Sequence, residues 1–485
     1  MKILIIQLAR LGDIYQTWPV VRGLKRAYPK AEIHFLARKK FAPACEGLSE
    51  IKKVWQLDTR SILEPLIEEQ PNFKKTFNQL DQIFSGLDSE KFDKVINLSF
   101  SPLSSFITHN LEENGAEVRG YSRHSDGFFN PVDDASAYFY SQVGPGRANR
   151  VHLTELFAQV AGIELRDDDW NPGKYPTSKF SKVGAIVVHL GASESKKTYG
   201  SHKWIQVVRG LLEKTNREVI LIGSKDERDL GFVVENVTSH RKPINVVGKT
   251  ELSDLFDIFS QASVLIGCDS GPVHIAALTK TPVLNLSFSS VSFWETGPKS
   301  GGSRILVSDS PEGLSSDKVV EECLALLNGR NPANDVVVVP QSRLHTYITS
   351  KEVETLPEWE MIQAVYMGAS FPFQNTRTFI EAINRLNETN ELAIEQVRGL
   401  RKFPANKVAG TILERVDEIY ETIAKMVPSV GVLIRWFQTE RIRLGPLKQN
   451  DLLDATESLH MKLRDILSMY APETEGGQYD DVSVG

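Results

Sequence analysis

The sequence has few cysteines, no long apolar run and no large excess of charge of either sign. Its three cysteines, Cys45, Cys268 and Cys323, form no CxxC or Cys/His cluster, so we expect neither a disulfide framework nor a zinc site. The run from Ile3 to Leu8 is far shorter than the roughly 18 apolar residues that a membrane-spanning helix needs. The formal net charge of -6 does not indicate a nucleic-acid-binding protein. We therefore predict a cytoplasmic protein that contacts a membrane at most peripherally, at the inner face of the cytoplasmic membrane.

Several catalytic motifs are also absent. No GxGxxG follows the first apolar run, which disfavours a dinucleotide dehydrogenase. Neither HExxH nor a nucleophile elbow occurs, which disfavours a zinc protease and a serine hydrolase of those types. Gly248-Lys249-Thr250 resembles the end of a phosphate-binding loop, but Pro243 stands where that loop requires glycine.

The chain does contain two series of short apolar runs that alternate with helical patterns. In the first third, the runs Ile3–Leu8, 32–37 and 93–98 predict buried strands. A second series begins near Val183 with GAIVVHLG and continues to about residue 286. Alternation of this kind is typical of βαβ units and a parallel sheet, and it indicates an α/β fold with two Rossmann-like domains that face each other across a cleft.

The boundaries follow from composition and periodicity. A polar segment with two prolines, 165–182, predicts a linker between domains 1–170 and 171–330. Residues 331–471 have a period near 3.6 and predict a C-terminal α-helical appendage, while the acidic and glycine-containing 472–485 predicts a disordered tail. One predicted helical face of the appendage comprises Ile412, Leu413, Val416, Ile419, Tyr420 and Ile423.

The turn after the first predicted strand supplies the first candidate site residues. Gly12 and Asp13 follow that strand, and ligands of open α/β sheets gather beyond the carboxyl ends of the strands. Asp13 could act there as a general base toward a hydroxyl group, with Gly12 as a neighbouring ligand-binding position. The alternative is that Asp13 only caps the following helix.

A second candidate group follows the strand that ends in His189-Leu190-Gly191-Ala192-Ser193. The backbone N–H groups and the Ser193 hydroxyl suit phosphate oxygens, and Lys203 would add a positive charge. The alternative for Lys203 is a solvated surface position. Glu227 follows another strand end and could accept hydrogen bonds from ribose hydroxyls, or it could only begin the next helix.

The third candidate group, Asp269-Ser270-Gly271-Pro272, is the most specific. An apolar strand ends just before it, and a helix begins with Pro272, which suits the first helical turn. The N–H groups at that start, with the helix dipole behind them, predict a diphosphate site. His274 on the first turn is either a ligand contact or a hydrogen-bonded structural histidine.

These motifs together resemble glycosyltransferase family 9, the bacterial heptosyltransferases. RLGD, HLGAS with KW, IGSKDE, VGKTEL and DSGPVHIAA occur in the family's order over roughly residues 1–330. The resemblance implies a GT-B fold with an acceptor-side first domain and a donor-binding second domain, and an inverting, metal-independent transfer from ADP-activated heptose. It implies that Asp13 is the catalytic base and that Glu227 lies at the adenosine ribose. The positions implied for the donor phosphates are Ser193, Lys203, Asp269, Ser270 and Gly271.

Three functional hypotheses follow. The first is a heptosyltransferase acting on lipopolysaccharide core or a related bacterial glycan or glycolipid. The second keeps the chemistry but makes the acceptor a protein that the helical appendage recruits. The third is a non-catalytic module that binds a nucleotide sugar. In each case the ligand is a nucleotide-diphosphate sugar, with neither a further cofactor nor a metal, and the sequence does not give the oligomeric state.

Overall fold

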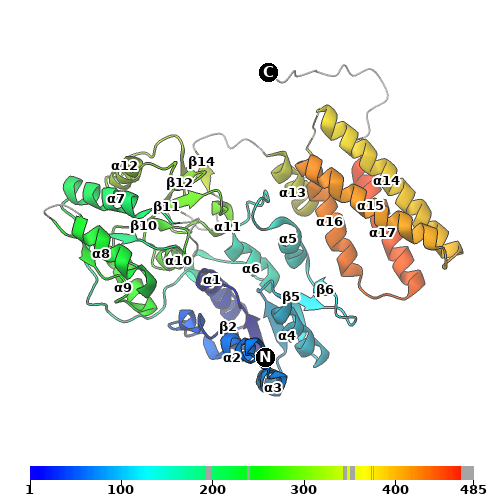
Figure 1. The fold of residues 1–485 in the computed structure, drawn as a ribbon, viewed down its shortest axis with the longest axis horizontal. Coiled ribbons are helices and arrows are strands. Elements are labelled where there is room, and N and C mark those ends of the chain that lie inside the picture. The colour runs from blue at the N-terminus through cyan, green and yellow to red at the C-terminus, as the bar shows by residue number, and fades with distance from the viewer. Residues whose placement is uncertain are drawn as a thin grey trace. The chain divides into compact units, whose positions relative to one another are not determined.

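A computed structural model describes residues 1–192, 198–237, 241–341, 347–349, 356–372, 374 and 376–470 (Figure 1). The chain divides into two compact units. The first unit comprises residues 1–119 and 151–353, and the second comprises 120–150 and 354–485. The tail predicted over 472–485 lies outside the described residues. No helix among the described residues is both long and apolar enough to cross a membrane.

A six-stranded sheet in the order β3-β2-β1-β4-β5-β6 forms early in the chain. Strands β3, β2, β1 and β4 pair in parallel, with Ile3 aligned to both Ile33 and Lys94. Residues 3–6 are fully buried, as expected for a parallel strand covered on both faces. The chain passes from the first unit to the second within β5. The strands are β1 (Lys2–Ile6), β2 (Glu32–Arg38), β3 (Ile51–Leu57), β4 (Lys94–Asn97), β5 (Glu117–Arg123) and β6 (Phe129–Pro131).

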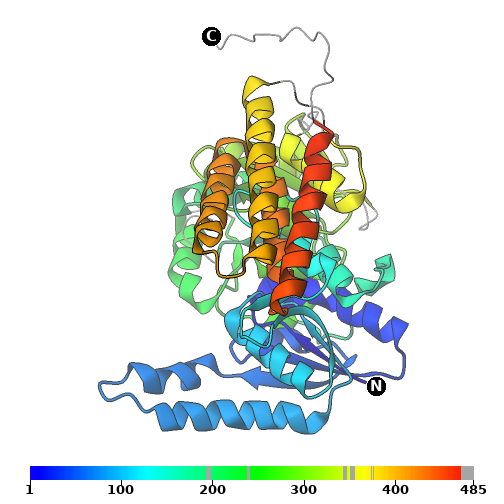
Figure 2. The same cartoon turned by 90° about the vertical axis from the view of Figure 1, so that its right-hand side faces the viewer.

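Helices connect the strands of this sheet. The first of them, α1, is buried along most of its length despite an internal Pro19. Helices α2 and α3 pack side by side as a helical hairpin (Figure 2). The helices of this part of the first unit are α1 (Leu11–Ala27), η1 (Ala42–Cys45), α2 (Thr59–Ile67), α3 (Phe73–Glu90), α4 (Pro102–Glu113), α6 (Leu153–Ala161) and η2 (Asp167–Asp169).

An eight-stranded sheet follows, in the order β14-β13-β12-β11-β10-β7-β8-β9. It is parallel from β12 to β9 and antiparallel at β13 and β14, so the boundary predicted near residue 330 falls before its last two strands. The strands are β7 (Ile186–His189), β8 (Val219–Ile222), β9 (Ile244–Asn245), β10 (Val264–Cys268), β11 (Val283–Phe288), β12 (Arg304–Ser308), β13 (Val336–Val338) and β14 (Ile348–Thr349). The helices are α7 (Ser201–Lys214), η4 (Lys225–Glu227), α8 (Arg228–Val237), α9 (Leu252–Gln261), α10 (Gly271–Leu278), α11 (Phe293–Thr296) and α12 (Ser316–Leu327).

Helix α1 joins the two halves of the first unit by packing on α9 and α10. Trp18 of α1 stacks on Phe256 of α9 with ring centroids 5.3 Å apart, and Tyr15 meets the same ring edge-on. All three side chains are almost fully buried, and burial of each large apolar side chain contributes about 1.5–3 kcal/mol. This contact fixes the start of α1 beside the start of α10.

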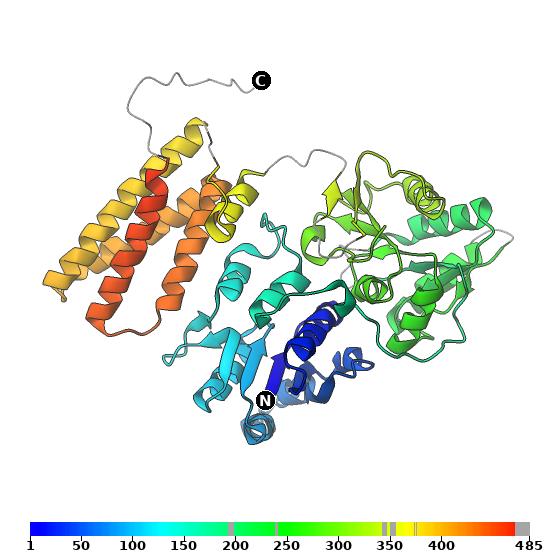
Figure 3. The same ribbon diagram turned by 180° about the vertical axis from the view of Figure 1, so that it is seen from behind.

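The second unit is mainly helical, as the 3.6-residue period predicted. Long helices α14, α15, α16 and α17 pack against one another (Figure 3), and α5 from the inserted segment 120–150 packs on α16. Val416, Tyr420 and Ile423 of the predicted helical face are buried. The helices are α5 (Asp134–Gln142), α13 (Pro357–Met367), α14 (Arg377–Lys402), α15 (Lys407–Met426), α16 (Pro428–Leu444) and α17 (Gln449–Ser468).

Candidate active site

Two helix starts converge in the first unit. A Cβ atom added to Gly12 at the start of α1 would lie 3.0 Å from His274 Cδ2 of α10. A Cβ added to Gly271 at the start of α10 would lie 2.9 Å from Leu11 Cδ2. Both glycines therefore allow a closer approach of the helices than any side chain would permit. The structure thus brings Gly12 and Asp13 together with the Asp269–Gly271 turn, although they are more than 250 residues apart.

Asp13 caps α1 and also feels the charge of Asp269 from the start of α10. Its Oδ2 accepts a hydrogen bond from the backbone N–H of Arg10 at 2.9 Å, so the capping alternative is observed. The side chain is half-buried, and loss of water raises its pKa, with a further rise from the charge of Asp269. The bond from Arg10 and its positive charge oppose that rise. A carboxylate with a raised pKa is a stronger base, which suits proton transfer without excluding the capping role.

His274 links α10 to α1. Its Nε2 lies 3.2 Å from Gln16 Nε2, and the side chain is buried. Burial lowers its pKa to about 4, although the nearby Asp269 charge acts in the opposite direction. The imidazole is therefore neutral at pH 7. This contact fits the structural alternative, and a ligand contact by His274 stays a prediction.

Ser270 faces the neighbouring strand end. Its hydroxyl donates to the Cys268 carbonyl at 3.0 Å and lies 3.1 Å from His189 Nδ1, and it makes no cap bond to α10. Its backbone is the N-cap of the helix, and the first turn of any helix leaves backbone N–H groups without intrahelical partners. The start of α10 thus has the donors and the dipole that suit an anion.

Glu227 lies against the ends of β7 and β8. Its Oε2 accepts from the backbone N–H of Ser224 at 2.5 Å. A Cβ added to Gly191 would lie 2.0 Å from Glu227 Oε1, and one added to Gly223 would lie 2.7 Å from Oε2. The Glu227 carboxylate therefore packs against the backbone of Gly191 and Gly223, at the same sheet edge as the β10–α10 turn.

Sequence reasoning gave no role to His189, which connects these groups. The ring contacts Ser270, is buried and has a pKa lowered to about 4 by burial, against the charge of Glu227. The signal that could have found it is its position: it is the last residue of β7, next to both β8 and β10 in the sheet.

The Lys203 side chain points to the loop after β12 and not to the residues around the start of α10. Its ammonium donates to the carbonyls of Pro311, Glu312 and Leu314 at 2.7, 2.8 and 2.6 Å, which uses all three of its N–H bonds. It therefore anchors the loop after β12 instead of pointing to a phosphate at α10, because three carbonyl oxygens of that loop satisfy its ammonium. Pro311 and Glu312 also line a cavity of about 330 Å³ at the ends of β11 and β12.

Two further predictions concern Ser193 and the absence of a metal ion. Ser193 lies outside the described residues, so its phosphate role stays a prediction. Among the described residues, no group of three or more His, Cys, Asp or Glu side chains is arranged to hold a metal ion.

Comparisons with known proteins agree with this architecture. Residues 82–322 match the sequence model of glycosyltransferase family 9 (heptosyltransferase). Lipopolysaccharide heptosyltransferase 3 of Escherichia coli K12 is 24% identical over 282 residues, which cover 57% of this chain and 79% of that protein. Lipopolysaccharide core heptosyltransferase OpsX of Haemophilus influenzae is 22% identical over 296 residues, covering 58% and 77%.

Solved structures show the same fold. The family 9 glycosyltransferase of Veillonella parvula has a TM-score of 0.52 at 17% identity, covering 68% of this chain and 97% of that one. E. coli heptosyltransferase WaaC, determined with ADP, has a TM-score of 0.51 at 14% identity, covering 67% and 100%. These structures confirm the predicted fold, and the family-model match confirms the resemblance to glycosyltransferase family 9. Residues 82–322 are therefore identified as similar to glycosyltransferase family 9 (heptosyltransferase), and the chain is a glycosyltransferase.

Proposed function

We propose that this enzyme transfers heptose from ADP-heptose to a lipopolysaccharide-core or related bacterial glycan acceptor, with inversion and without a metal ion. The observation that carries the proposal is the position of Asp13 beside the start of α10, where a base and an anion site meet. The names of the related proteins support the sugar and the acceptor class, and the ADP in the WaaC structure supports the donor.

In the proposed reaction, Asp13 takes the proton of an acceptor hydroxyl. The acceptor oxygen then attacks the anomeric carbon while the bond from that carbon to the diphosphate oxygen breaks. ADP leaves with the electron pair of that bond, and the backbone N–H groups and dipole at the start of α10 stabilise its growing charge. Attack from the face opposite the leaving group inverts the anomeric configuration. Glu227 accepts hydrogen bonds from the donor ribose.

Two groups near the diphosphate would have positioning roles. His189 and Ser270 form a neutral pair beside the β10–α10 turn, so they orient the turn without repelling or attracting charge strongly. We do not give Lys203 the role of a phosphate contact, because its ammonium is engaged by the loop after β12. The charge on the diphosphate is then stabilised mainly by backbone donors.

The direct test is transfer from ADP-heptose by the full chain, with and without EDTA. Heptose-deficient lipopolysaccharide should gain the mass of one heptose, with release of ADP, the inverted anomer by NMR and the same rate in EDTA. A delipidated protein fraction is the second acceptor. Transfer to protein alone would favour the protein-acceptor hypothesis, and tight donor binding with no transfer to either acceptor would favour a non-catalytic binding module.

Substitution of Gly191 by alanine tests the role of Glu227. The new Cβ would occupy the space of the Glu227 carboxylate and must displace it. Because a charge-assisted hydrogen bond to the donor would be lost, we expect the donor Kd to rise about 10-fold in calorimetry. The double variant G191A/E227A should bind no more weakly than E227A, since both changes remove one interaction.

A matched control is Gly410→Ala, because an added Cβ at that helical glycine meets no atom within 4 Å. It should leave the donor Kd unchanged. Additive weakening of binding by G191A and E227A would contradict the proposal, as would no effect of G191A. Either result would show that Gly191 does not act by leaving space for a Glu227 carboxylate that binds the nucleotide sugar.

The pKa of Asp13 predicts the acidic side of the pH profile. A base must be ionised, so kcat/KM should fall as pH drops through a pKa above the usual value of about 3.9 for aspartate. Asp269→Asn removes a negative charge that raises this pKa, so the acidic limb should move to lower pH, even if the rate also falls. A limb that stayed in place or moved upward would contradict the assignment of Asp13 as the titrating base.

A further inference from the structure

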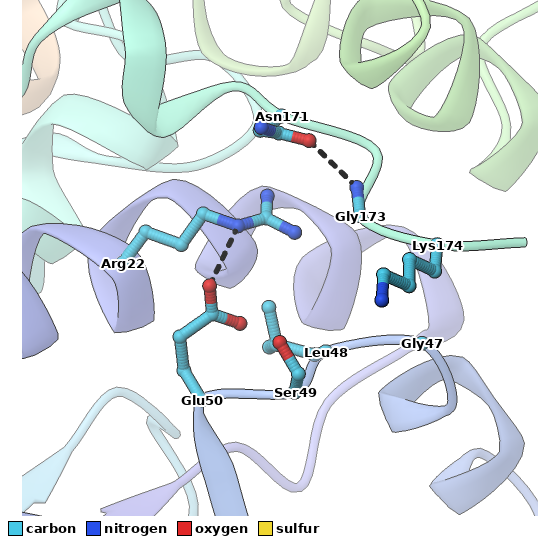
Figure 4. A pocket seen from close by; sticks show the side chains of 8 residues that line it. All are labelled: Arg22, Gly47, Leu48, Ser49, Glu50, Asn171, Gly173 and Lys174. Atoms are coloured by element: carbon cyan, nitrogen blue, oxygen red, sulfur yellow. Dashed lines mark hydrogen bonds and ion pairs between the residues drawn. The ribbon is translucent and has the colours of Figure 1, made fainter.

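A second cavity lies along the flank of α1, away from the converging helix starts. Its volume is about 570 Å³, and its walls come from Arg22 of α1, the 47–50 loop before β3 and the 171–174 segment that leads to the second sheet (Figure 4). Arg22 is nine residues beyond Asp13, which places it about 13 Å further along the helix. The cavity is therefore separate from the proposed transfer site.

Arg22 is buried at this cavity with part of its guanidinium unpaired. The side chain is 8% exposed, and its Cζ lies 5.2 Å from the centroid of the Trp18 ring. Nε lies 3.4 Å from Glu50 Oε1, and Nη1 donates to the Asp169 carbonyl at 3.3 Å. Within the described residues, Nη2 has no hydrogen-bond partner. A buried N–H donor without a partner costs about 1–3 kcal/mol, so the site favours a ligand that accepts from it.

The opposite wall supplies a second cation. Lys174 is exposed and lines the cavity, and its side chain points toward the same space as the Arg22 guanidinium (Figure 4). Gly173 allows the 171–174 segment to lie close to the 47–50 loop. A Cβ added to Gly173, whose φ is +71°, would lie only 2.7 Å from the Gly47 carbonyl oxygen. The two cations outnumber the single carboxylate of the cavity, Glu50, so the local charge favours an anion.

Glu50 adds a requirement beyond negative charge. Its Oε2 is buried and has no hydrogen-bond donor within the described residues, although its Oε1 pairs with Arg22. A simple anion would satisfy Arg22 and Lys174 but would leave this oxygen unpaired. A hydroxyl group next to the anionic group of the ligand could donate to it.

We propose that this cavity binds a small hydroxylated oxyanion, a phosphate ester or carboxylate of a sugar or polyol. The oxyanion accepts from Arg22 Nη2 and Lys174, and a neighbouring hydroxyl donates to Glu50 Oε2. Because Arg22 lies on α1 and Lys174 on the segment between the two sheets, the bound ligand ties that segment to α1. Binding should therefore also raise the thermal stability of the full chain.

The test is calorimetry on the full chain with four probes: glycerol 3-phosphate, glycerate, inorganic phosphate and glycerol. We expect the first two to bind, with their ratio showing whether phosphate or carboxylate is preferred. Inorganic phosphate should bind several-fold more weakly than glycerol 3-phosphate because it lacks the carbon-bound hydroxyls. Lys174→Ala should raise the Kd of glycerol 3-phosphate about 10-fold, the loss expected for one charge-assisted hydrogen bond.

The control is Lys182→Ala, which removes an exposed lysine eight residues further along the chain and outside the cavity, and it should leave the Kd unchanged. Absence of binding by both anionic probes would overturn the proposal, as would an unchanged Kd in K174A. Binding of glycerol as tight as that of glycerol 3-phosphate would show that the site does not select an anion. The readout needs no transferase activity, so it is independent of the proposed function.

Discussion

Replacement of Asp13 by asparagine is expected to lower kcat for heptosyl transfer by about 10²–10⁴-fold, with donor affinity unchanged. Asparagine keeps an oxygen that can accept from the Arg10 N–H, so the start of α1 stays capped. It cannot take a proton from the acceptor hydroxyl, however. The loss should therefore appear in single-turnover rates and not in the donor Kd measured by calorimetry.

The structure provides a close control for this experiment. Asp254 holds the same capping position on α9, where its Oδ2 accepts from the Glu251 N–H at 2.9 Å, and it is half-buried like Asp13. Asp254→Asn removes a charge from an equivalent cap and should leave kcat within experimental error. Equal activity of D13N and the wild type, or an equal loss in D254N, would show that Asp13 acts only as a cap.

Replacement of Asn390 by alanine is expected to destabilise the helices of the second unit by about 3–5 kcal/mol. Asn390 Oδ1 accepts from Tyr420 OH at 3.1 Å and from His460 Nδ1 at 2.7 Å, and its Nδ2 donates to the His460 carbonyl at 2.9 Å. All three residues are buried. The variant leaves the Tyr420 and His460 side-chain donors without this partner in a buried position, at a cost of about 1–3 kcal/mol each, and it removes the bond to the His460 carbonyl.

Hydrogen exchange measured by mass spectrometry over α14, α15 and α17 would report this change locally. N390A should exchange faster in all three helices, since the network joins them. The neighbouring Thr389→Val is the control, because among the described residues the Thr389 hydroxyl bonds only to the Arg385 carbonyl of its own helix. Unchanged protection in N390A, or equal loss in T389V, would mean that the buried network does not hold the helices together.

Much of the candidate site could be predicted from local patterns. The apolar run before Asp269 and the proline after Gly271 locate a strand end and a helix start, and both occur where expected. The position of Asp13 just after β1 follows from the same reasoning. These features depend on residues within a few positions of each other, whose preferences for strand, turn or helix are set by local sterics and hydrogen bonding.

The direction of long polar side chains could not be predicted in this way. Lys203 lies in the first turn of α7, yet its ammonium meets carbonyls more than 100 residues further along the chain. Likewise, no local pattern shows that residues 120–150 belong with the C-terminal helices, because α5 packs on α16, which is far away in the sequence.

By itself, the sequence determined the alternating strands and helices, the two converging helix starts as separate motifs, and the family that they indicate. Only the tertiary structure decided which polar groups meet. His189 contacts Ser270 across 81 positions, and Gln16 contacts His274 across 258. The tertiary structure likewise buries Arg22 and leaves its Nη2 without a hydrogen-bond partner among the described residues. The periodicity of a helix or strand shows which of its faces is apolar. The element that packs on that face is decided by the packing of the whole chain, and so are the hydrogen-bond partners of nearby polar groups.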